Sequence, residues 1–194
     1  MTARLKPLSF QPLPPGAISP EGWLRNQLRI QADGLSGHLD EFWPDIMNSQ
    51  WFGGDAEGWE RAPYWLDGFI PLAFLLNDPA LKDRVHRYLD HILTHQHDDG
   101  WLGPKPDDPS RYDVWAQMLA LKVLTQYHDA AGDPRVPAAV DRALEKLDDH
   151  IRRMTLYNWG HTRWFETLIA LYWRYENTGA PSLLDLAVKL HAQG

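Results

Sequence analysis

The sequence predicts an all-α protein built as an array of helical hairpins. Two observations lead to this prediction. Apolar residues recur at helical spacing in about seven segments, and no segment alternates apolar and polar residues as a half-buried strand would. Related breaks also recur at a spacing of roughly fifty residues, the size of one αα-hairpin with its loop. These breaks are Asn-Asp-Pro at 77–79, Gly-Asp-Pro at 132–134 and Gly-Ala-Pro at 179–181.

The helix boundaries follow from local signals. Ser19 and Pro20 provide an N-cap and a proline for a first helical turn, so the first helix is expected to run to about residue 34. The residues before it, 1–18, are rich in proline and are expected to form an extended arm, which leaves 19–194 as the helical domain. Residues 35–62 are expected to form a long, aromatic, functional loop that can include short helical turns. The remaining helices are expected at about 63–76, 79–95, 113–131, 136–153, 162–177 and from 182 onward, with Pro71 kinking or restarting the second.

Two architectures fit this array: an open α-solenoid, and an (α/α)6 toroid in which six hairpins close around a funnel. The unequal loops and their aromatic content favour the toroid. The long loops fall between hairpins at one end of the stack, which places Trp59, Trp101 and Trp159 on one rim. Seven helices are fewer than six hairpins require, so we expect the chain to be the N-terminal portion of such a toroid. Hairpin faces left open would then favour self-association.

Composition excludes several classes of function. The net charge of −7 disfavours nucleic acid, which needs a basic face. No apolar run approaches the ~18 residues of a membrane span, and no signal peptide is seen, so no membrane is expected and a cytoplasmic location is the default. The absence of cysteine rules out a disulfide, a thiolate zinc site and a cysteine nucleophile within this chain.

Aromatic residues mark the expected rim. The chain has ten tryptophans, and several lie beside charged residues in predicted loops rather than in apolar helix stripes. The densest example is residues 58–69, at the start of a predicted helix. Such a mixture is typical of a sugar-binding surface, and its members are Trp59, Glu60, Arg61, Tyr64, Trp65, Asp67 and Phe69.

Glu166 is the first candidate carboxylate. If its helix starts near Thr162, these two residues share a face. An acidic side chain in an otherwise apolar helix costs several kcal/mol unless it is paired. Two interpretations stay open: Glu166 pairs with Arg163 and locks two hairpins together, or it faces the funnel and binds sugar hydroxyls or acts as an acid or base. His161, in the same loop, is a candidate substrate-binding residue because it titrates near neutral pH.

Asp67 and Glu60 pose the same choice. Glycoside hydrolysis usually needs two carboxylates, one to protonate the leaving oxygen and one to attack or to activate water. Asp67, on a predicted inner helix, is the better candidate, whereas Glu60 and Arg61 can form an ion pair that rigidifies the loop. At the next inner helix, Asp113 is expected to act as an N-terminal charge, and Gln117 would suit hydroxyl recognition if it points inward.

A metal site is not expected. His91 and His95 are four residues apart on one helix face, a spacing that can hold zinc, but no acidic third ligand accompanies them.

Two long runs resemble a known family, the catalytic domain of β-L-arabinofuranosidase-type enzymes, glycoside hydrolase family 127. The runs are GWLRNQLRIQADGLSGHLDEFW (22–43) and WERAPYWLDGFIPLAFLLNDPALKDRVHRYLDHILTHQHDDGWLGP (59–104). The resemblance extends from about residue 16 to the end. It implies a six-hairpin glycosidase fold and an enzyme that removes terminal sugars from a pentose-containing carbohydrate.

The resemblance also assigns residues. In the family, a glycine-rich segment ending in Asn-Glu opens an inner helix and supplies a substrate-binding glutamate, and residues 159–166 here correspond to it, so Glu166 takes that role. The local sequence departs from the pattern, with His-Thr-Arg-Trp-Phe before Glu166, and a family histidine falls near Gln117. The resemblance further implies a cysteine nucleophile beside zinc held by cysteine and glutamate in a later part of the domain, and this chain lacks those cysteines.

The sequence therefore leads to two hypotheses about the function of the chain. In the first, the chain is part of a glycoside hydrolase, with Glu166 and Asp67 as its carboxylates. In the second, it is a noncatalytic carbohydrate-binding or scaffold protein. The residues expected to contact sugar are Trp59, Glu60, Tyr64, Trp65, Trp101, Gln117, Trp159, His161 and Arg163.

Overall fold

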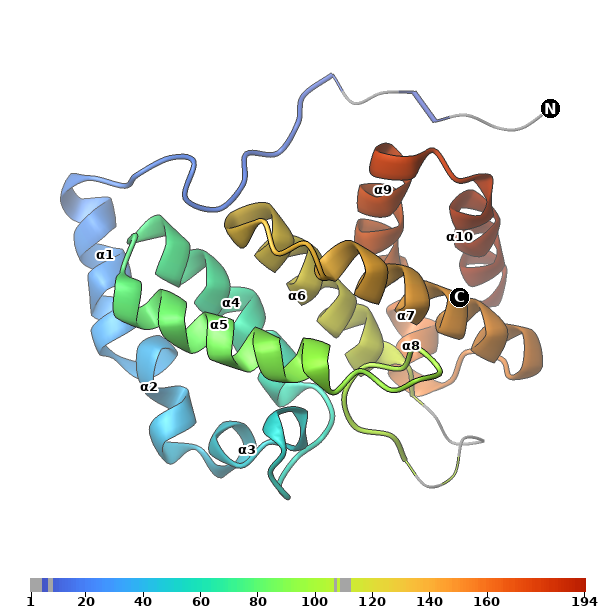
Figure 1. Ribbon diagram of the computed structural model, residues 1–194, viewed down its shortest axis with the longest axis horizontal. Helices are drawn as coiled ribbons and strands as arrows, with labels where there is room; N and C mark the ends of the chain where they lie inside the picture. The colour runs from blue at the N-terminus through green and yellow to red at the C-terminus, as the bar shows by residue number, and fades with distance from the viewer. Residues whose placement is uncertain (1–4, 7–8, 107, 109–112) are drawn as a thin grey trace.

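The computed structural model describes residues 5–6, 9–106, 108 and 113–194 (Figure 1). Residues 1–4 and 7–8 of the expected arm, and residues 107 and 109–112 between the helices expected at 79–95 and 113–131, lie outside the described residues. The secondary structure of the described part is helical, without strands, which confirms the all-α prediction.

All seven predicted helices are present, within a few residues of their expected bounds. They are α1 (Gly22–Asp33), α4 (Arg61–Leu75), α5 (Pro79–Thr94), α6 (Trp115–Ala131), α7 (Val136–Arg153), α9 (Thr167–Thr178) and α10 (Pro181–Gln193). The segment 35–62 is more helical than expected. It holds α2 (Leu35–Phe42), α3 (Pro44–Met47) and the 3-10 turn η1 (Gln50–Phe52).

The three predicted breaks end or start helices for identifiable reasons. Asp78 caps α5, because its carboxylate accepts hydrogen bonds from the backbone N–H groups of Ala80 (3.0 Å) and Leu81 (3.2 Å). Gly132 and Gly179 end α6 and α9 in the left-handed conformation, at φ 70° and 67°, which glycine adopts without steric cost. Each break therefore turns one helix directly into its partner.

The helices pair as three hairpins, α4–α5, α6–α7 and α9–α10. The first members form a continuous row, in which α6 packs against α4 on one side and α9 on the other. The second members pack on that row, with α7 touching both α6 and α9, while α1 and α2 lie beside α4 (Figure 1). This is the arrangement expected of a fragment of a helical-hairpin toroid.

The apolar core lies between the row and its outer helices. Outer helix α7 contributes a narrow stripe that includes Val136, Val140, Leu144, Leu147 and Ile151, at the spacing of one helix face. Inner helices α4 and α6 are buried on more sides, as helices with neighbours on both flanks must be. Pro71 does not restart α4, which runs as one helix through it. None of the helices in the described residues is long and apolar enough to cross a membrane.

The beginning of α9 differs from the prediction. A short helix α8 (Asn158–Thr162) and the 3-10 turn η3 (Trp164–Glu166) precede it, with Arg163 between them. Thr162 and Glu166 therefore belong to different elements, and the prediction that they share one helix face is wrong. The change of direction places Glu166 at the start of α9, beside the first turn of α6.

Candidate functional site

Trp115, the first residue of α6, lies at the centre of an aromatic cluster. Its ring meets Trp59 and Tyr64 edge-on, each at 5.5 Å between ring centroids, and stacks on Trp159 at 5.4 Å. Trp115 is only 3% exposed, whereas Tyr64 and Trp159 are each 41% exposed. The cluster therefore has a buried centre and two aromatic side chains that reach solvent.

The ion pair Glu166–Arg163 lies against this cluster. Glu166 accepts a hydrogen bond from the indole Nε1–H of Trp115 on one oxygen (3.0 Å) and from Arg163 on the other (3.1 Å). The Arg163 guanidinium lies 5.3 Å from the Trp115 ring and 5.6 Å from the Trp159 ring, within the range of cation–π attraction. The predicted pairing of Glu166 with Arg163 is thus observed. Each carboxylate oxygen keeps a second lone pair that can accept another hydrogen bond.

Tyr64 faces several charges. Partial burial raises the pKa of its hydroxyl, and the negative charges of Glu166, Glu60 and Asp67 raise it further, while Arg163 opposes them. The hydroxyl is therefore held in its protonated, hydrogen-bond-donating form over a wider pH range. Both predicted carboxylates, Glu166 and Asp67, therefore act on the pKa of one tyrosine.

Asp67 joins α4 to α6. Its Oδ2 accepts a hydrogen bond from Lys122 (2.7 Å), a residue that the sequence did not single out. Its Oδ1 is buried with no hydrogen-bond partner among the described residues. A buried carboxylate oxygen without a donor is costly, and this oxygen can accept one further hydrogen bond.

Asp113 fixes the backbone beneath the cluster. Its carboxylate accepts from the N–H groups of Trp115 (3.0 Å), Trp159 (3.0 Å) and Gly160 (2.9 Å), so it ties the start of α6 to the start of α8. A Cβ atom at Gly160 would lie 3.0 Å from a methyl carbon of Val114, tighter than ordinary van der Waals contact, so glycine suits this approach. The predicted role of Asp113 as a charge at a helix N-terminus is consistent with this geometry.

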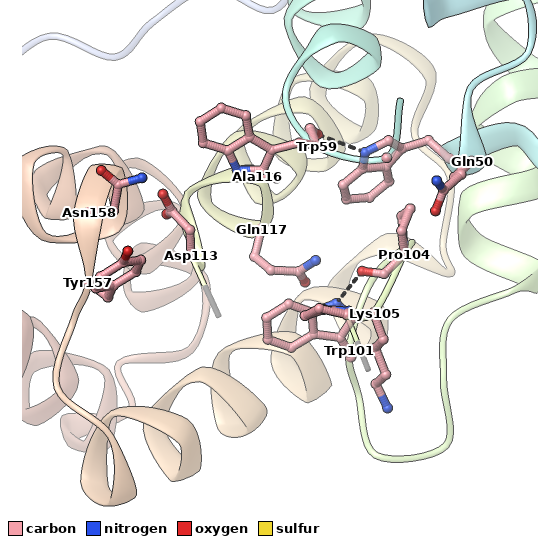
Figure 2. A pocket seen from close by; sticks show the side chains of 13 residues that line it. Gln50, Trp59, Trp101, Pro104, Lys105, Asp113, Ala116, Gln117, Tyr157 and Asn158 are labelled. Atoms are coloured by element: carbon pink, nitrogen blue, oxygen red, sulfur yellow. Dashed lines mark hydrogen bonds between the residues drawn. The ribbon is translucent and has the colours of Figure 1, made fainter. Parts of the chain in front are cut away.

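A cleft of about 470 Å³ adjoins the cluster through Trp59, which contacts Trp115 and also lines the cleft (Figure 2). Gln117 lines it from the first turn of α6, Asn158 from the start of α8, and Trp101 and Tyr157 from the loops before these helices. The loops that precede α4, α6 and α9 thus meet at one end of the row.

Some predicted contact residues are engaged within the protein. The side-chain amide of Gln117 binds the backbone of Leu102, accepting from its N–H at 3.0 Å and donating to its carbonyl, so this amide holds the loop. The indole of Trp101 donates to the carbonyl of Pro104 (3.0 Å, Figure 2). Both side chains shape the cleft wall while their polar groups bind protein.

Other predicted residues lie outside the cluster. Trp65 is a core residue: it stacks on Phe69 at 4.6 Å and donates to the carbonyl of Ser36 (2.9 Å), so it faces α2 and not the cluster. The reason is helical geometry, because Trp65 follows Tyr64 by one residue and points about 100° away from it. Glu60 pairs with Arg61 at 3.5 Å, the interpretation favoured from sequence, and His161 is exposed on α8.

The central position of Trp115 could not be predicted from the sequence. The helix expected at about 113–131 includes this residue near its start, but the spacing of residues could not show which indole lies between the others. The proximity of Lys122 to Asp67 was missed for a related reason: the two residues are 55 positions apart, and their contact depends on how α4 packs against α6.

Comparison with known families identifies the chain. The sequence profile of the β-L-arabinofuranosidase GH127 catalytic domain matches residues 9–194. The chain belongs to this family. The family assignment supports a glycoside hydrolase and agrees with the all-helical hairpin fold. Comparison with curated proteins and with solved structures gives no match.

The zinc site that the family resemblance implies does not fit the residues of this chain. The chain has no cysteine to supply a thiolate. Within the described ranges, no three or more His, Asp or Glu side chains gather as a metal ion would need. His91 and His95 stack on each other at 3.9 Å, and a ring nitrogen of His95 lies 2.9 Å from the carbonyl of His91.

Proposed function

We propose that this chain forms the sugar-binding part of a glycoside hydrolase that acts on a terminal β-L-arabinofuranosyl or related pentose unit. The observation that carries the proposal is the Glu166–Arg163 pair lying against the Trp115 cluster. An ionised pair supplies acceptors and donors for sugar hydroxyls, and the exposed rings of Tyr64 and Trp159 supply apolar faces for the C–H groups of the sugar.

The two carboxylates receive different roles in this proposal. Glu166, with a donor on each oxygen, is suited to orient the sugar by accepting from its hydroxyl groups. Asp67, with one buried oxygen unpartnered, is the candidate for proton transfer or for activating water. Lys122 orients Asp67 through a hydrogen bond of 2.7 Å. Family membership and the hydrogen bonds that hold each carboxylate, from Trp115 to Glu166 and from Lys122 to Asp67, support these assignments.

Titration with sugar tests this function. Methyl β-L-arabinofuranoside is added while tryptophan fluorescence is recorded, with methyl β-D-glucopyranoside as the comparison sugar. We expect a saturable change with the arabinofuranoside, because several indoles border the site, and a weaker response to the hexose. If no pentose glycoside tested gives a saturable change, the proposal is wrong.

A second function, noncatalytic sugar binding, is favoured by the absence of cysteine in a chain whose family resemblance implies a cysteine nucleophile. Release of p-nitrophenol from p-nitrophenyl β-L-arabinofuranoside separates the two functions. Hydrolysis that Asp67→Asn abolishes supports the enzyme. Saturable binding without hydrolysis supports the binding protein.

A further inference from the structure

Trp115 contacts residues from four separate segments of the candidate site. Its ring contacts Trp59 from the loop before α4, Tyr64 from α4 and Trp159 from α8. Its indole N–H reaches Glu166 in η3. Because Trp115 is 3% exposed, it has almost no surface with which to touch a ligand itself.

The contacts of Trp115 restrict Glu166 in a specific way. A glutamate at the end of a short 3-10 turn has several rotamers available. The indole N–H fixes one carboxylate oxygen at 3.0 Å, and Arg163, which lies 5.3 Å from the Trp115 ring, fixes the other. The orientation of both charged groups therefore depends on one buried side chain.

We propose that Trp115 is the positioning residue of the sugar site, holding Glu166 and Arg163 in the orientation that binds sugar. This inference rests on the proposed function for its sugar-binding consequence. The hydrogen bond from the indole N–H to Glu166 is the observation behind this proposal. This bond distinguishes a positioning role from a role in core packing alone. A packing role needs only the ring, whereas positioning needs the donor.

Trp115→Phe tests the distinction, because phenylalanine keeps an aromatic ring and lacks the N–H. Trp173→Phe is a matched control: the indole of Trp173 also donates to a carboxylate, that of Asp129, at 2.9 Å, but away from the cluster. With calorimetric titration of methyl β-L-arabinofuranoside, we expect Trp115→Phe to weaken affinity by about tenfold, the loss of one charge-assisted hydrogen bond, and Trp173→Phe to leave it unchanged. Equal affinity of Trp115→Phe and the unsubstituted protein would overturn the proposal.

A second measurement keeps the test decisive if Trp115→Phe does not fold. In ¹³C/¹⁵N-labelled unsubstituted protein, each indole N–H gives its own signal, and through-bond and through-space correlations assign that of Trp115 without any Trp115 variant. We expect Glu166→Gln to shift the Trp115 indole signal and to leave that of Trp173 in place. An unmoved Trp115 signal would contradict the bond itself. Because this readout needs no sugar, it separates failure of the positioning role from failure of the proposed function.

Discussion

At the scale of single residues, the site depends on charged groups that are only partly exposed. The side chain of Glu166 is 17% exposed and that of Asp67 is 22% exposed. Carboxylates this far from water need partners to offset the loss of hydration, and each has a basic partner, Arg163 for Glu166 and Lys122 for Asp67. Removing a partner or a charge should therefore have a measurable effect.

Glu166→Gln removes the negative charge while keeping the shape of the side chain. We expect at least tenfold weaker binding of methyl β-L-arabinofuranoside, because the charged acceptor becomes neutral and Arg163 loses its ion-pair partner. The matched control is Glu176→Gln, an exposed glutamate on helix α9, which follows the 3-10 turn of Glu166. This variant should bind as the unsubstituted protein does. Isothermal calorimetry gives the affinities. Unchanged affinity for Glu166→Gln would remove this residue from the site.

Lys122→Met removes the cationic partner of Asp67 and keeps the aliphatic stem. We expect the free energy of unfolding to fall by about 1–3 kcal/mol, because a largely buried carboxylate loses its donor. Urea denaturation measures the change. The double variant Asp67→Asn/Lys122→Met should be less destabilised than the sum of the single variants, and strict additivity would argue against a direct Asp67–Lys122 interaction.

At the scale of elements, hydrogen bonds and ion pairs between side chains, here called clasps, connect neighbouring helices. Arg84 and Tyr88 on α5 both bind Asp40 on α2, the tyrosine hydroxyl at 2.6 Å. Burial and the nearby carboxylate raise the pKa of Tyr88 to about 12. Arg174 on α9 makes a two-pronged contact with Asp141 on α7, at 2.5 and 2.6 Å.

Tyr88→Phe tests the clasp between α2 and α5. The variant lacks the hydroxyl that donates to Asp40, so this carboxylate, whose side chain is only 4% exposed, has one fewer donor. We expect a loss of about 1–3 kcal/mol in the free energy of unfolding, measured by urea denaturation. Tyr157→Phe, at a tyrosine that is 56% exposed, serves as the control and should change stability little. Equal stability of both variants would show that the clasp contributes nothing.

The sequence predicted the elements better than it predicted the site. Helical spacing and the three proline-containing breaks were enough to locate the seven main helices, because both signals are local. The start of α9 was predicted at about residue 162 and lies at Thr167. Residues 158–162 form a separate short helix instead, because the N–H groups of Trp159 and Gly160 donate hydrogen bonds to Asp113. Trp65 was assigned to the site and lies in the core, since composition alone does not say which of two adjacent aromatics turns inward.

At the scale of the whole molecule, a pH dependence of stability follows from His91. Burial and the neighbouring His95 lower the pKa of His91 below its usual 6.5. The unfolded chain therefore binds more protons than the folded protein as the pH falls through 6.5, and stability decreases with acidification. We expect His91→Gln to flatten the fall in unfolding free energy between pH 7 and 5. A slope unaffected by His91→Gln would contradict the assignment.

Exposed apolar residues on the first helix lead to a further expectation. Trp23 and Ile30, seven residues apart on α1, are 78% and 65% exposed. Light scattering should show a molar mass that rises with protein concentration, and Trp23→Ser with Ile30→Ser should suppress the rise. Asn26→Ser on the same helix is the control. A constant monomer mass at all concentrations would contradict self-association through this face.

We propose that a pentose binds where Glu166 and Arg163 meet the Trp115 cluster. A crystal structure of the protein with methyl β-L-arabinofuranoside would show directly where the sugar binds. We predict the sugar within hydrogen-bond distance of Glu166 and Arg163, with a ring face against Tyr64 or Trp159. A sugar bound elsewhere, with this cluster vacant at saturating concentration, would contradict the account.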